Sequence, residues 1–254
     1  MFSIDPRGGH NRYKFKTDFF EKWSPEMAYV LGFTFADGNI TDAKSSRAQY
    51  FHVDSKDKNI IEKIKIILGA NHPIYINASH FSEHKNGRYK SKDLFRLRIG
   101  SKKLFNDLLQ LGLTPNKSKT VRFPANIPEE FLGDFVRGYF DGDGCVYFQK
   151  GRGITKPIII KKLSVIFTSG SYNFLEELSK ILKSRLLLRH DKIYRGSGAF
   201  QIRYSTADSL KIFSLIYKDC NNGLYLERKF DIFREYFQMA PQKIDHEMTG
   251  ILNN

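Results

Sequence analysis

The chain has 254 residues, and its 41 Lys and Arg against 27 Asp and Glu give a formal net charge of +14, a surplus that favours a polyanionic partner. Its apolar runs are short and interrupted by charges, which argues against a membrane span, and its N-terminal region lacks the apolar core of a secretory signal. Two cysteines are too few for a disulfide framework, so we expect an intracellular, reducing compartment such as the cytoplasm, nucleoid or an organelle matrix.

The first half of the chain follows a regular order of predicted elements after a basic N-terminal extension over residues 1–22. Residues 28–40, "AYVLGFTFADGNI", read as an apolar helix that ends in an Asp-Gly pair. An extended stretch leads into an amphipathic helix over 58–69, in which isoleucines recur at helical spacing. Residues 94–113 alternate as a strand and then become helical. We assign residues 23–114 to a first domain.

The same order recurs 106 residues later, after a proline-containing linker over residues 115–128. Residues 135–146, "FVRGYFDGDGCV", repeat the apolar run and the Asp-Gly pair. A predicted strand, an amphipathic helix and a strand that becomes helical follow. We assign residues 129–237 to a second, similar domain, because an internal repeat of this size predicts two related units. Residues 238–254 read as a loosely ordered C-terminal tail.

Small residues recur along one face of each motif helix. Ala28, Gly32 and Ala36 are four residues apart in the first motif, and Gly138 and Gly142 repeat this spacing in the second. Small side chains along one stripe let another backbone approach closely. We therefore predict that the two motif helices pack against each other and form the domain interface.

Each motif helix ends in an Asp-Gly pair, Asp37-Gly38 and Asp143-Gly144. We expect each glycine to adopt the left-handed conformation of a helix C-cap. A carboxylate at this end opposes the helix macrodipole, so helix stability alone would not select Asp. Helices that end side by side would bring the two carboxylates together, and a hard divalent cation such as Mg²⁺ would relieve their repulsion. A simple turn explains one such pair better than it explains a repeated one.

The paired motifs resemble those of the LAGLIDADG homing endonucleases, at "VLGFTFADG" (30–38) and "VRGYFDGDG" (136–144). Asp37 and Asp143 fall on the catalytic acid of that motif. The two copies differ two positions earlier, where the first has Phe and the second has Asp141. Such unlike halves imply a monomer, without an obligate protein partner, that recognises an asymmetric DNA site.

The resemblance implies an α+β fold of two pseudo-symmetric αββαββα domains, whose antiparallel sheets form a saddle over double-stranded DNA. It also implies a Mg²⁺-dependent endonuclease that makes a site-specific double-strand break with short 3′ overhangs. Asp37 and Asp143, with the backbone of Gly38 and Gly144, would bind two or three Mg²⁺ ions. Mn²⁺ is expected to substitute for Mg²⁺, and Ca²⁺ to support binding only.

The resemblance further implies one basic group per half near the scissile phosphate. The segments "PNKSK" and "YLERK" occupy corresponding places after the third predicted helix of each half. Lys117 and Arg228 are our candidates for this catalytic role, and Lys119 and Lys229 for phosphate contacts. Basic residues after a helix are most often solvated linker charges or dipole partners, which remains the alternative.

Alternation along the strands yields candidates for DNA contact. In "DLFRLRIG", Arg96 and Arg98 fall on one face and apolar residues on the other. Arg and Gln can read guanine and adenine edges bidentately in the major groove. The candidates are Arg47, Gln49, Arg96, Arg98, Lys161, Gln201 and Arg203. A solvated amphipathic sheet would show the same alternation, and this alternative stays open for each residue.

Other functions are weighed against the nuclease. An RNA maturase or a DNA-binding regulator could use the same scaffold, but the presence of both acids favours an enzyme. An intein would begin with Cys or Ser and end in His-Asn, whereas Met1 and the terminal Asn pair favour a free-standing or intron-encoded reading frame. The histidines lack the spacing of metal ligands on a helix, and His80 and His84 read as part of a hairpin.

Overall fold

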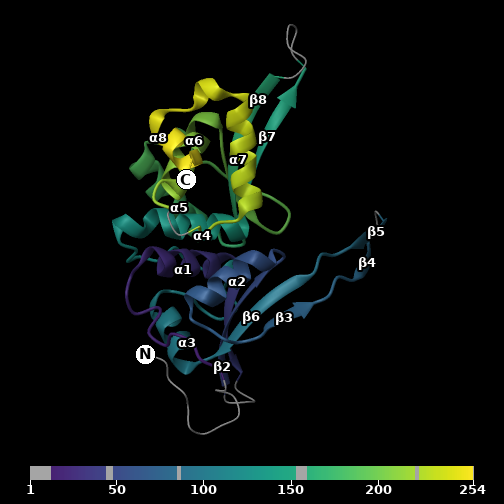
Figure 1. The fold of residues 1–254 in the computed structure, drawn as a ribbon, viewed down its shortest axis with the longest axis vertical. Helices are drawn as coiled ribbons and strands as arrows, with labels where there is room; N and C mark the ends of the chain where they lie inside the picture. Colours follow the sequence, from purple (N-terminus) through teal and green to yellow (C-terminus); the bar gives the residue numbers. More distant parts are fainter. Residues whose placement is uncertain (1–12, 44–47, 85–86, 153–158, 221–222, 254) are drawn as a thin grey trace.

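The computed structural model describes residues 13–43, 48–84, 87–152, 159–220 and 223–253. Two halves, each an antiparallel sheet with helices packed on it, meet along a central pair of helices (Figure 1). This arrangement confirms the predicted α+β architecture of two αββαββα units. Among the described residues, no helix is both long and apolar enough to cross a membrane.

The first half contains one four-stranded sheet in the order β1-β2-β6-β3. Its elements are α1 (Pro25–Asp37), β1 (Gly38–Ala43), β2 (Ala48–Ser55), α2 (Lys58–Ile67), β3 (Ile74–Asn77), β6 (Leu94–Gly100) and α3 (Lys102–Gln110). A separate two-stranded hairpin, here called the arm, consists of β4 (Phe81–His84) and β5 (Gly87–Lys90) and extends away from the sheet in Figure 1. The predicted hairpin around His80 and His84 is thus present.

The second half repeats this plan in the order β7-β8-β10-β9. Its elements are α4 (Leu132–Asp143), β7 (Gly144–Gly151), β8 (Ile159–Ser169), α5 (Tyr172–Leu186), β9 (Ile193–Arg195), β10 (Phe200–Tyr204) and α6 (Thr206–Tyr217). Two further helices follow, α7 (Glu227–Met239) and α8 (His246–Asn253). Short 3₁₀ turns cover Lys117–Lys119, Glu129–Phe131 and Pro241–Lys243.

The alternation of side chains fixes which face of each sheet is buried. In β2, Phe51 and Val53 point into the core, and Leu97 and Ile99 do so from the neighbouring β6. Helices α2 and α3 pack on this face, while α5 and α6 cover the second sheet in the same way. Each sheet therefore keeps one face for its helices and presents the other outward.

The contact between α1 and α4 is made backbone to backbone. A Cβ added to Gly32 would lie 2.0 Å from the carbonyl oxygen of Phe135, and one added to Gly138 would lie 2.0 Å from that of Tyr29. No side chain fits at either position, so the two helices approach as closely as glycine allows. The predicted packing of small residues is therefore present.

The glycines that end these helices have a different role from the one predicted. Gly38 has φ −101° and ψ 171°, and Gly144 has φ −91° and ψ 163°, so both are extended rather than left-handed. Each helix passes directly into a strand at this point. Glycine is required for space, because a Cβ would lie 2.6 Å from Thr34 Cα at the first site and 2.3 Å from Phe140 Cδ2 at the second.

Both chain ends are more closely integrated than expected. Within the predicted N-terminal extension, Phe15 and Phe20 are buried, and Lys16 N donates to the carbonyl of Leu68. The predicted loose tail contains α8, whose Met248 and Ile251 are buried at helical spacing and which packs near α6. Buried apolar side chains hold both segments, so each belongs to the adjacent core.

We expect Gly138→Ala to lower the free energy of unfolding by about 3 kcal/mol, because its methyl group must push the two helix backbones apart. Urea unfolding followed by circular dichroism measures the change. Gly250→Ala is the matched control, since a Cβ at this position in α8 meets no atom within 4 Å. The control should be neutral or slightly stabilising. Equal stability of Gly138→Ala and the native protein would contradict the backbone contact.

Candidate active site

The two acids of the repeated motif end adjacent helices. A Cβ on Gly142, one residue before Asp143, would lie 2.3 Å from Ala36 Cβ and 3.5 Å from Asp37 Cγ. Burial raises the pKa of Asp143 to about 6, and the charge of Asp37 adds to this rise. Burial likewise raises the pKa of Asp37, although nearby lysine charges oppose it. The helix pair thus holds two carboxylates close enough to repel each other.

Lys117 lies at the C-terminal end of α1. Its Nζ donates to the carbonyl oxygens of Phe35 at 2.7 Å and Ala36 at 2.9 Å. The side chain is buried, although it comes from a segment that the sequence suggests is a linker. Burial lowers its pKa to about 8, while Asp143 and Asp37 favour its charged form. Lys117 therefore neutralises the carbonyl end of α1 and faces both acids.

Lys229 occupies the corresponding place beneath α4. Its Nζ donates to the carbonyl oxygens of Phe140 at 2.5 Å, Asp141 at 2.8 Å and Gly144 at 2.6 Å. Burial lowers its pKa to about 8, opposed mainly by the charge of Asp141. Arg228 is the predicted counterpart of Lys117, but Arg228 is exposed and Lys229 is buried.

The helical period of α7 contains the signal that would have separated these two residues. Lys229, Phe233 and Tyr236 follow helical spacing and are all buried, whereas Arg228 lies off this stripe. A lysine on the apolar stripe of a helix must find buried acceptors. Lys119, the other expected phosphate contact, is exposed at the surface.

The donors at this site suit a hard cation. Two carboxylates with mutually unfavourable charges would be relieved by a divalent ion with oxygen ligands. Among the described residues, no cluster of three or more His, Cys, Asp and Glu side chains forms a complete metal site. Asp37 and Asp143 therefore fit a divalent cation only if water or a bound substrate supplies the remaining ligands. The carbonyl of Gly144, an expected ligand, accepts a hydrogen bond from Lys229.

The outward faces of the two sheets carry most of the expected basic residues. On the first sheet, Arg96 makes a bidentate pair with Asp54 at 2.7 and 2.6 Å, and Arg98 lies 3.7 Å above the ring of Tyr50. On the second sheet, the Arg203 guanidinium donates to Gln201 Oε1, at 2.8 Å for the shorter of two contacts.

The remaining candidates from the strands lie elsewhere. Gln49 has the parity of Phe51 and Val53, so the register places it on the core-facing side of β2 rather than on the outward face. Lys161 is exposed in β8 beside an irregularity of the β7–β8 pairing. Arg47 lies outside the described residues. A short sequence window could not fix the strand parity, which is set by the pairing with β1 and β6.

Sequence reasoning missed the arm as a basic and aromatic surface. Phe81 and Tyr89 are 56% and 53% exposed there, and the Arg88 guanidinium lies 4.2 Å from the centre of the Phe81 ring. Lys90 lies 5.8 Å from the same ring. The alternation of "GRYK" could have indicated this strand. In the second half β9 takes the place of β3, and residues 196–199 connect it to β10 where the first half has the arm.

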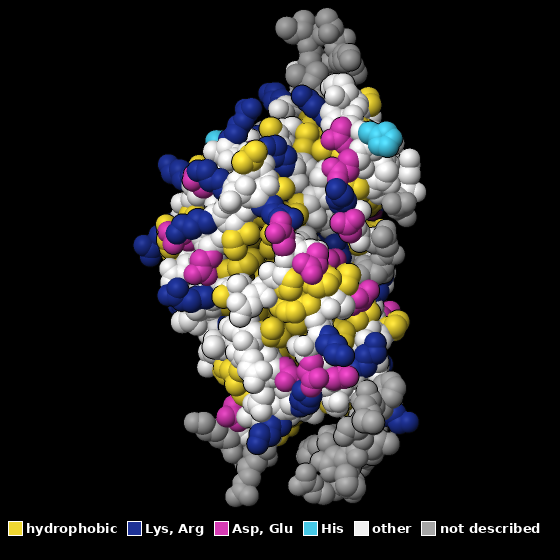
Figure 2. Space-filling model, turned by 90° about the vertical axis from the view of Figure 1, so that its left-hand side faces the viewer, with side chains coloured by type: hydrophobic (Ala, Val, Ile, Leu, Met, Phe, Trp, Pro, Cys, Tyr) yellow, Lys and Arg dark blue, Asp and Glu magenta, His cyan; other side chains and the backbone are white. Residues whose placement is uncertain are grey.

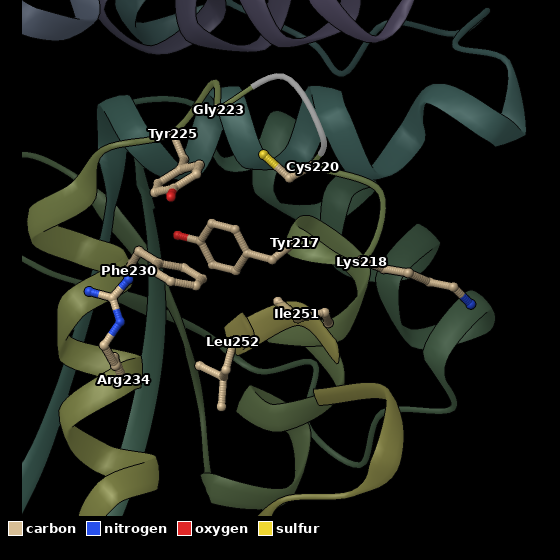
Figure 3. A pocket seen from close by; sticks show the side chains of 9 residues that line it. All are labelled: Tyr217, Lys218, Cys220, Gly223, Tyr225, Phe230, Arg234, Ile251 and Leu252. Carbon is tan, nitrogen blue, oxygen red and sulfur yellow. The ribbon is translucent and has the colours of Figure 1, made fainter. Parts of the chain in front are cut away.

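Other surfaces differ from this site. Figure 2 shows the side of the molecule opposite the arm. Basic and acidic side chains are interspersed there around hydrophobic side chains. Figure 3 shows a pocket of about 400 Å³ in the second half, lined by aromatic rings of Tyr217, Tyr225 and Phe230 and by Cys220. Neither Asp37 nor Asp143 lines this pocket.

The raised pKa of Asp143 predicts a pH-dependent effect on stability. Its ionised form is disfavoured by burial and by Asp37 in the folded protein, and Lys117 and Lys229 only partly compensate. A folded pKa of about 6, above the ordinary value of an aspartic acid, means that this cost exists above pH 6 and disappears as the pH falls through 6 towards 4.

We therefore expect Asp143→Asn to unfold at higher urea concentration than the native protein at pH 7, in buffer with a chelator. The difference should shrink steadily as the pH is lowered to about 4, because the native carboxyl becomes protonated. Asp42→Asn, on the exposed end of β1, is the control for the substitution itself and should unfold at the native urea concentration at pH 7. A difference that grows on acidification would refute the prediction.

Comparison with known proteins agrees with the fold. Residues 130–217 match the model of the LAGLIDADG-like domain. The LAGLIDADG meganuclease I-AabMI bound to uncleaved DNA is similar over 87% of this chain and 92% of its own, with 14% identity and a TM-score of 0.53. The homing endonuclease I-WcaI bound to its DNA recognition sequence is similar over 85% and 90%, with 14% identity and a TM-score of 0.58.

Curated relatives are longer proteins. An uncharacterized protein of Methanocaldococcus jannaschii is 29% identical over 131 residues, which are 50% of this chain and 41% of that protein. The DNA-directed RNA polymerase subunit Rpo1C of the same organism is 30% identical over 125 residues, 48% of this chain and 13% of the subunit. The ribonucleoside-diphosphate reductase NrdEB subunit alpha of Bacillus subtilis is 25% identical over 257 residues, 89% of this chain and 22% of the subunit.

The chain spans less than half the length of these three relatives. The domain match and the fold are therefore the properties that it shares with known proteins. Residues 130–217 match the LAGLIDADG-like domain, and the chain as a whole shares its two-domain fold with the two LAGLIDADG endonuclease structures described above.

Proposed function

We propose that this protein is a site-specific endonuclease that cuts both strands of a long, asymmetric DNA duplex in a reaction that depends on Mg²⁺. The observation that carries the proposal is the pair of acids at the ends of two abutting helices, with one buried lysine beneath each helix end. Each half would act on one strand and leave short 3′ overhangs. The fold and the domain match agree with this activity.

The acids and lysines have separate roles in the proposed reaction. Asp37 and Asp143 would hold the divalent ions, together with phosphate oxygens of the substrate. Bound ions would lower the pKa of attacking water and stabilise charge on the leaving oxygen. Lys117 and Lys229 hold the helix ends in place and keep positive charge beside the acids, where they would also favour a phosphate.

The outward faces of the sheets would contact the DNA. Residues 23–114 and 129–237 would each recognise one half of the target, and the segment 115–128 would connect them while supplying Lys117. Arg96, Arg98, Gln201 and Arg203, on the strands of these faces, would contact base edges or phosphates. The two faces differ in composition, so the recognised half-sites should differ too. One chain provides both halves, so we propose a monomer.

A recognition protein without nuclease activity, such as an RNA maturase or a DNA-binding regulator, is less well supported. Binding alone requires neither acid, and placing two carboxylates together costs free energy. Both acids are present with a buried lysine beneath each. Catalysis accounts for this arrangement, whereas binding does not.

Selection from a library of long random duplexes tests the proposal. Duplexes would be bound in Ca²⁺, which should support binding without turnover, and Mg²⁺ would then be added. Sequencing of the released ends should show defined cuts in both strands. Specific binding without any cut would mean that the scaffold serves recognition alone, and RNA would then be tested.

We expect Asp37→Asn and Asp143→Asn to bind the selected target almost normally in Ca²⁺ while losing double-strand cleavage in Mg²⁺. Each change removes one ionic ligand but keeps the size of the side chain. Gel-shift titration and single-turnover cleavage measure the two properties. The Asp42→Asn control should cut normally. Double-strand cleavage by either motif variant at the native rate would refute the assignment of the acids.

We also expect the arm to contribute to affinity. Arg88→Ala combined with Lys90→Ala should weaken binding and reduce the slope of log affinity against log salt by roughly two, if each contacts a phosphate. Lys58→Ala combined with Lys180→Ala is the charge-matched control, since these residues pair with Glu62 and Glu176 on α2 and α5. An unchanged slope in the arm variant would show that the arm does not contact DNA.

A further inference from the structure

Asp141 is a buried carboxylate in the last turn of α4 and is only 1% exposed. Its Oδ2 accepts hydrogen bonds from the Tyr29 hydroxyl at 2.8 Å and from Leu226 N at 2.9 Å. Its Oδ1 has no hydrogen-bond partner within the described residues. Burying such a group costs free energy, so a hydrophobic residue would serve packing alone better.

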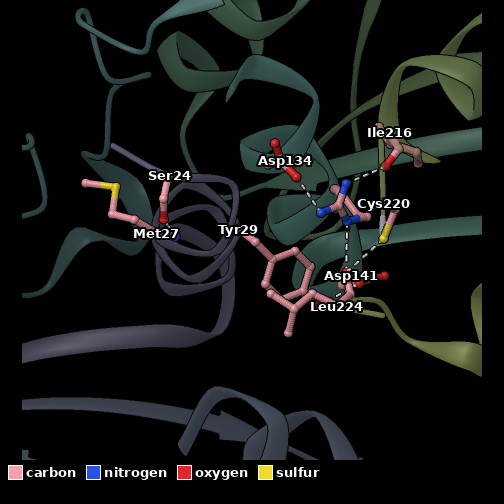
Figure 4. A network of polar contacts seen from close by, with 9 residues as sticks. Ser24, Met27, Tyr29, Asp134, Asp141, Ile216, Cys220 and Leu224 are labelled. Atoms are coloured by element: carbon pink, nitrogen blue, oxygen red, sulfur yellow. Dashed lines mark hydrogen bonds and ion pairs between the residues drawn. The ribbon is translucent and has the colours of Figure 1, made fainter. Parts of the chain in front are cut away.

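The carboxylate of Asp141 joins three helices at one point. Tyr29 belongs to α1, Asp141 to α4, and Leu226 immediately precedes α7. Figure 4 shows Tyr29 extending from α1 towards Asp141 on the neighbouring helix. Leu226 is the N-cap residue of α7 and has no side chain that could accept from the free amides of the first turn. Asp141 supplies an acceptor from outside the helix and fixes where α7 begins.

The start of α7 decides where Lys229 lies. Lys229 N bonds to the carbonyl of Leu226, so the lysine is held in the same turn that Asp141 anchors. From there its Nζ donates to three carbonyl oxygens. Two of them belong to Asp141 and Gly144, which lie on either side of Asp143 in the sequence. A shift of this turn would move the ammonium group away from the carbonyl oxygens at the end of α4, the helix that carries Asp143.

The first half supports its lysine in another way. Phe35 occupies the position equivalent to Asp141 and lies among aromatic rings, 5.6 Å from Phe135 and 6.3 Å from Phe174 between ring centres. Lys117 comes from a short 3₁₀ turn and bonds to the carbonyls of Phe35 and Ala36. The anchoring carboxylate thus belongs to the second half. Its negative charge also favours the charged form of Lys229.

We infer that Asp141 is a positioning residue that acts through Lys229 on one half of the catalytic centre, so that its removal slows the cutting of one DNA strand. The inference rests on the proposed nuclease function. It predicts that a change in a residue that does not contact the substrate can slow the cutting of one strand without slowing the other equally.

Strand-resolved cleavage tests this inference. With a different label on each strand of the selected target, Asp141→Ala should slow one strand roughly tenfold relative to the other, so that nicked duplex accumulates. Binding in Ca²⁺ should stay close to native. Asp141→Asn should restore most of the lost rate, because an amide oxygen can accept both hydrogen bonds. Asp208→Ala is the matched control, because it removes a buried carboxylate of the same half that accepts from the amides of Arg189 and His190, and it should not produce this nick.

Equal slowing of both strands by Asp141→Ala would overturn the inference, because it would indicate a general loss of structure. Failure of Asp141→Asn to restore the rate would also overturn it. In either case the nuclease itself would stand, since the native protein would still cut both strands.

Amide hydrogen exchange provides a readout that does not depend on cleavage. In Asp141→Ala, the amides of Leu226, Lys229 and Phe230 should exchange faster, because the turn that they form loses its anchor. The amides of Thr120 and Val121, which bond to the Lys117 carbonyl, should be unaffected. Unchanged exchange at the start of α7 would overturn the role of Asp141 whether or not the native protein cuts DNA. Absence of cleavage by the native protein would instead refute the proposed function.

Discussion

The backbone contact between α1 and α4 is the constraint on which the rest of the structure depends. Gly32 and Gly138 each face a carbonyl oxygen of the opposite helix at a distance that leaves no room for a side chain. Because both helices end at the same level, this contact brings their terminal acids together. The two sheets begin directly at these ends, where Gly38 and Gly144 start β1 and β7. One contact therefore positions both the candidate site and the two outward faces.

This closeness creates an electrostatic problem that the fold solves only in part. Burial and mutual repulsion raise the pKa of Asp143, and the two buried lysines compensate incompletely. Lys117 and Lys229 arrive from unrelated segments, a 3₁₀ turn and a helix, yet each donates to the carbonyl end of a motif helix. Each half therefore has an acid and a buried lysine at the end of its motif helix, although the segments that supply the two lysines differ. Active sites often contain ionisable groups whose pKa values are shifted by burial and by neighbouring like charges, although such groups lower stability.

The same divergence extends over both halves. The first sheet presents an Arg96–Asp54 pair and carries the arm, while the second presents Arg203 bonded to Gln201 and has only a short β9. At the centre, Phe35 packs among aromatic rings where Asp141 anchors α7. A single chain can vary its halves independently in this way, which suits an asymmetric partner.

The sequence by itself determined the repeat, the order of elements, the close helix packing and the two acids, because these follow from local periodicity and from residue types at fixed spacing. Only the tertiary structure decided that Lys229 rather than Arg228 matches Lys117, since this depends on how α7 is rotated against the end of α4. The outward or inward direction of Gln49, the extended conformation of Gly38 and the burial of the chain ends were likewise decided there. Each of these depends on contacts between segments far apart in the sequence. The period of α7 marks Lys229 as buried, but the helix end that its ammonium group meets is set by those distant contacts.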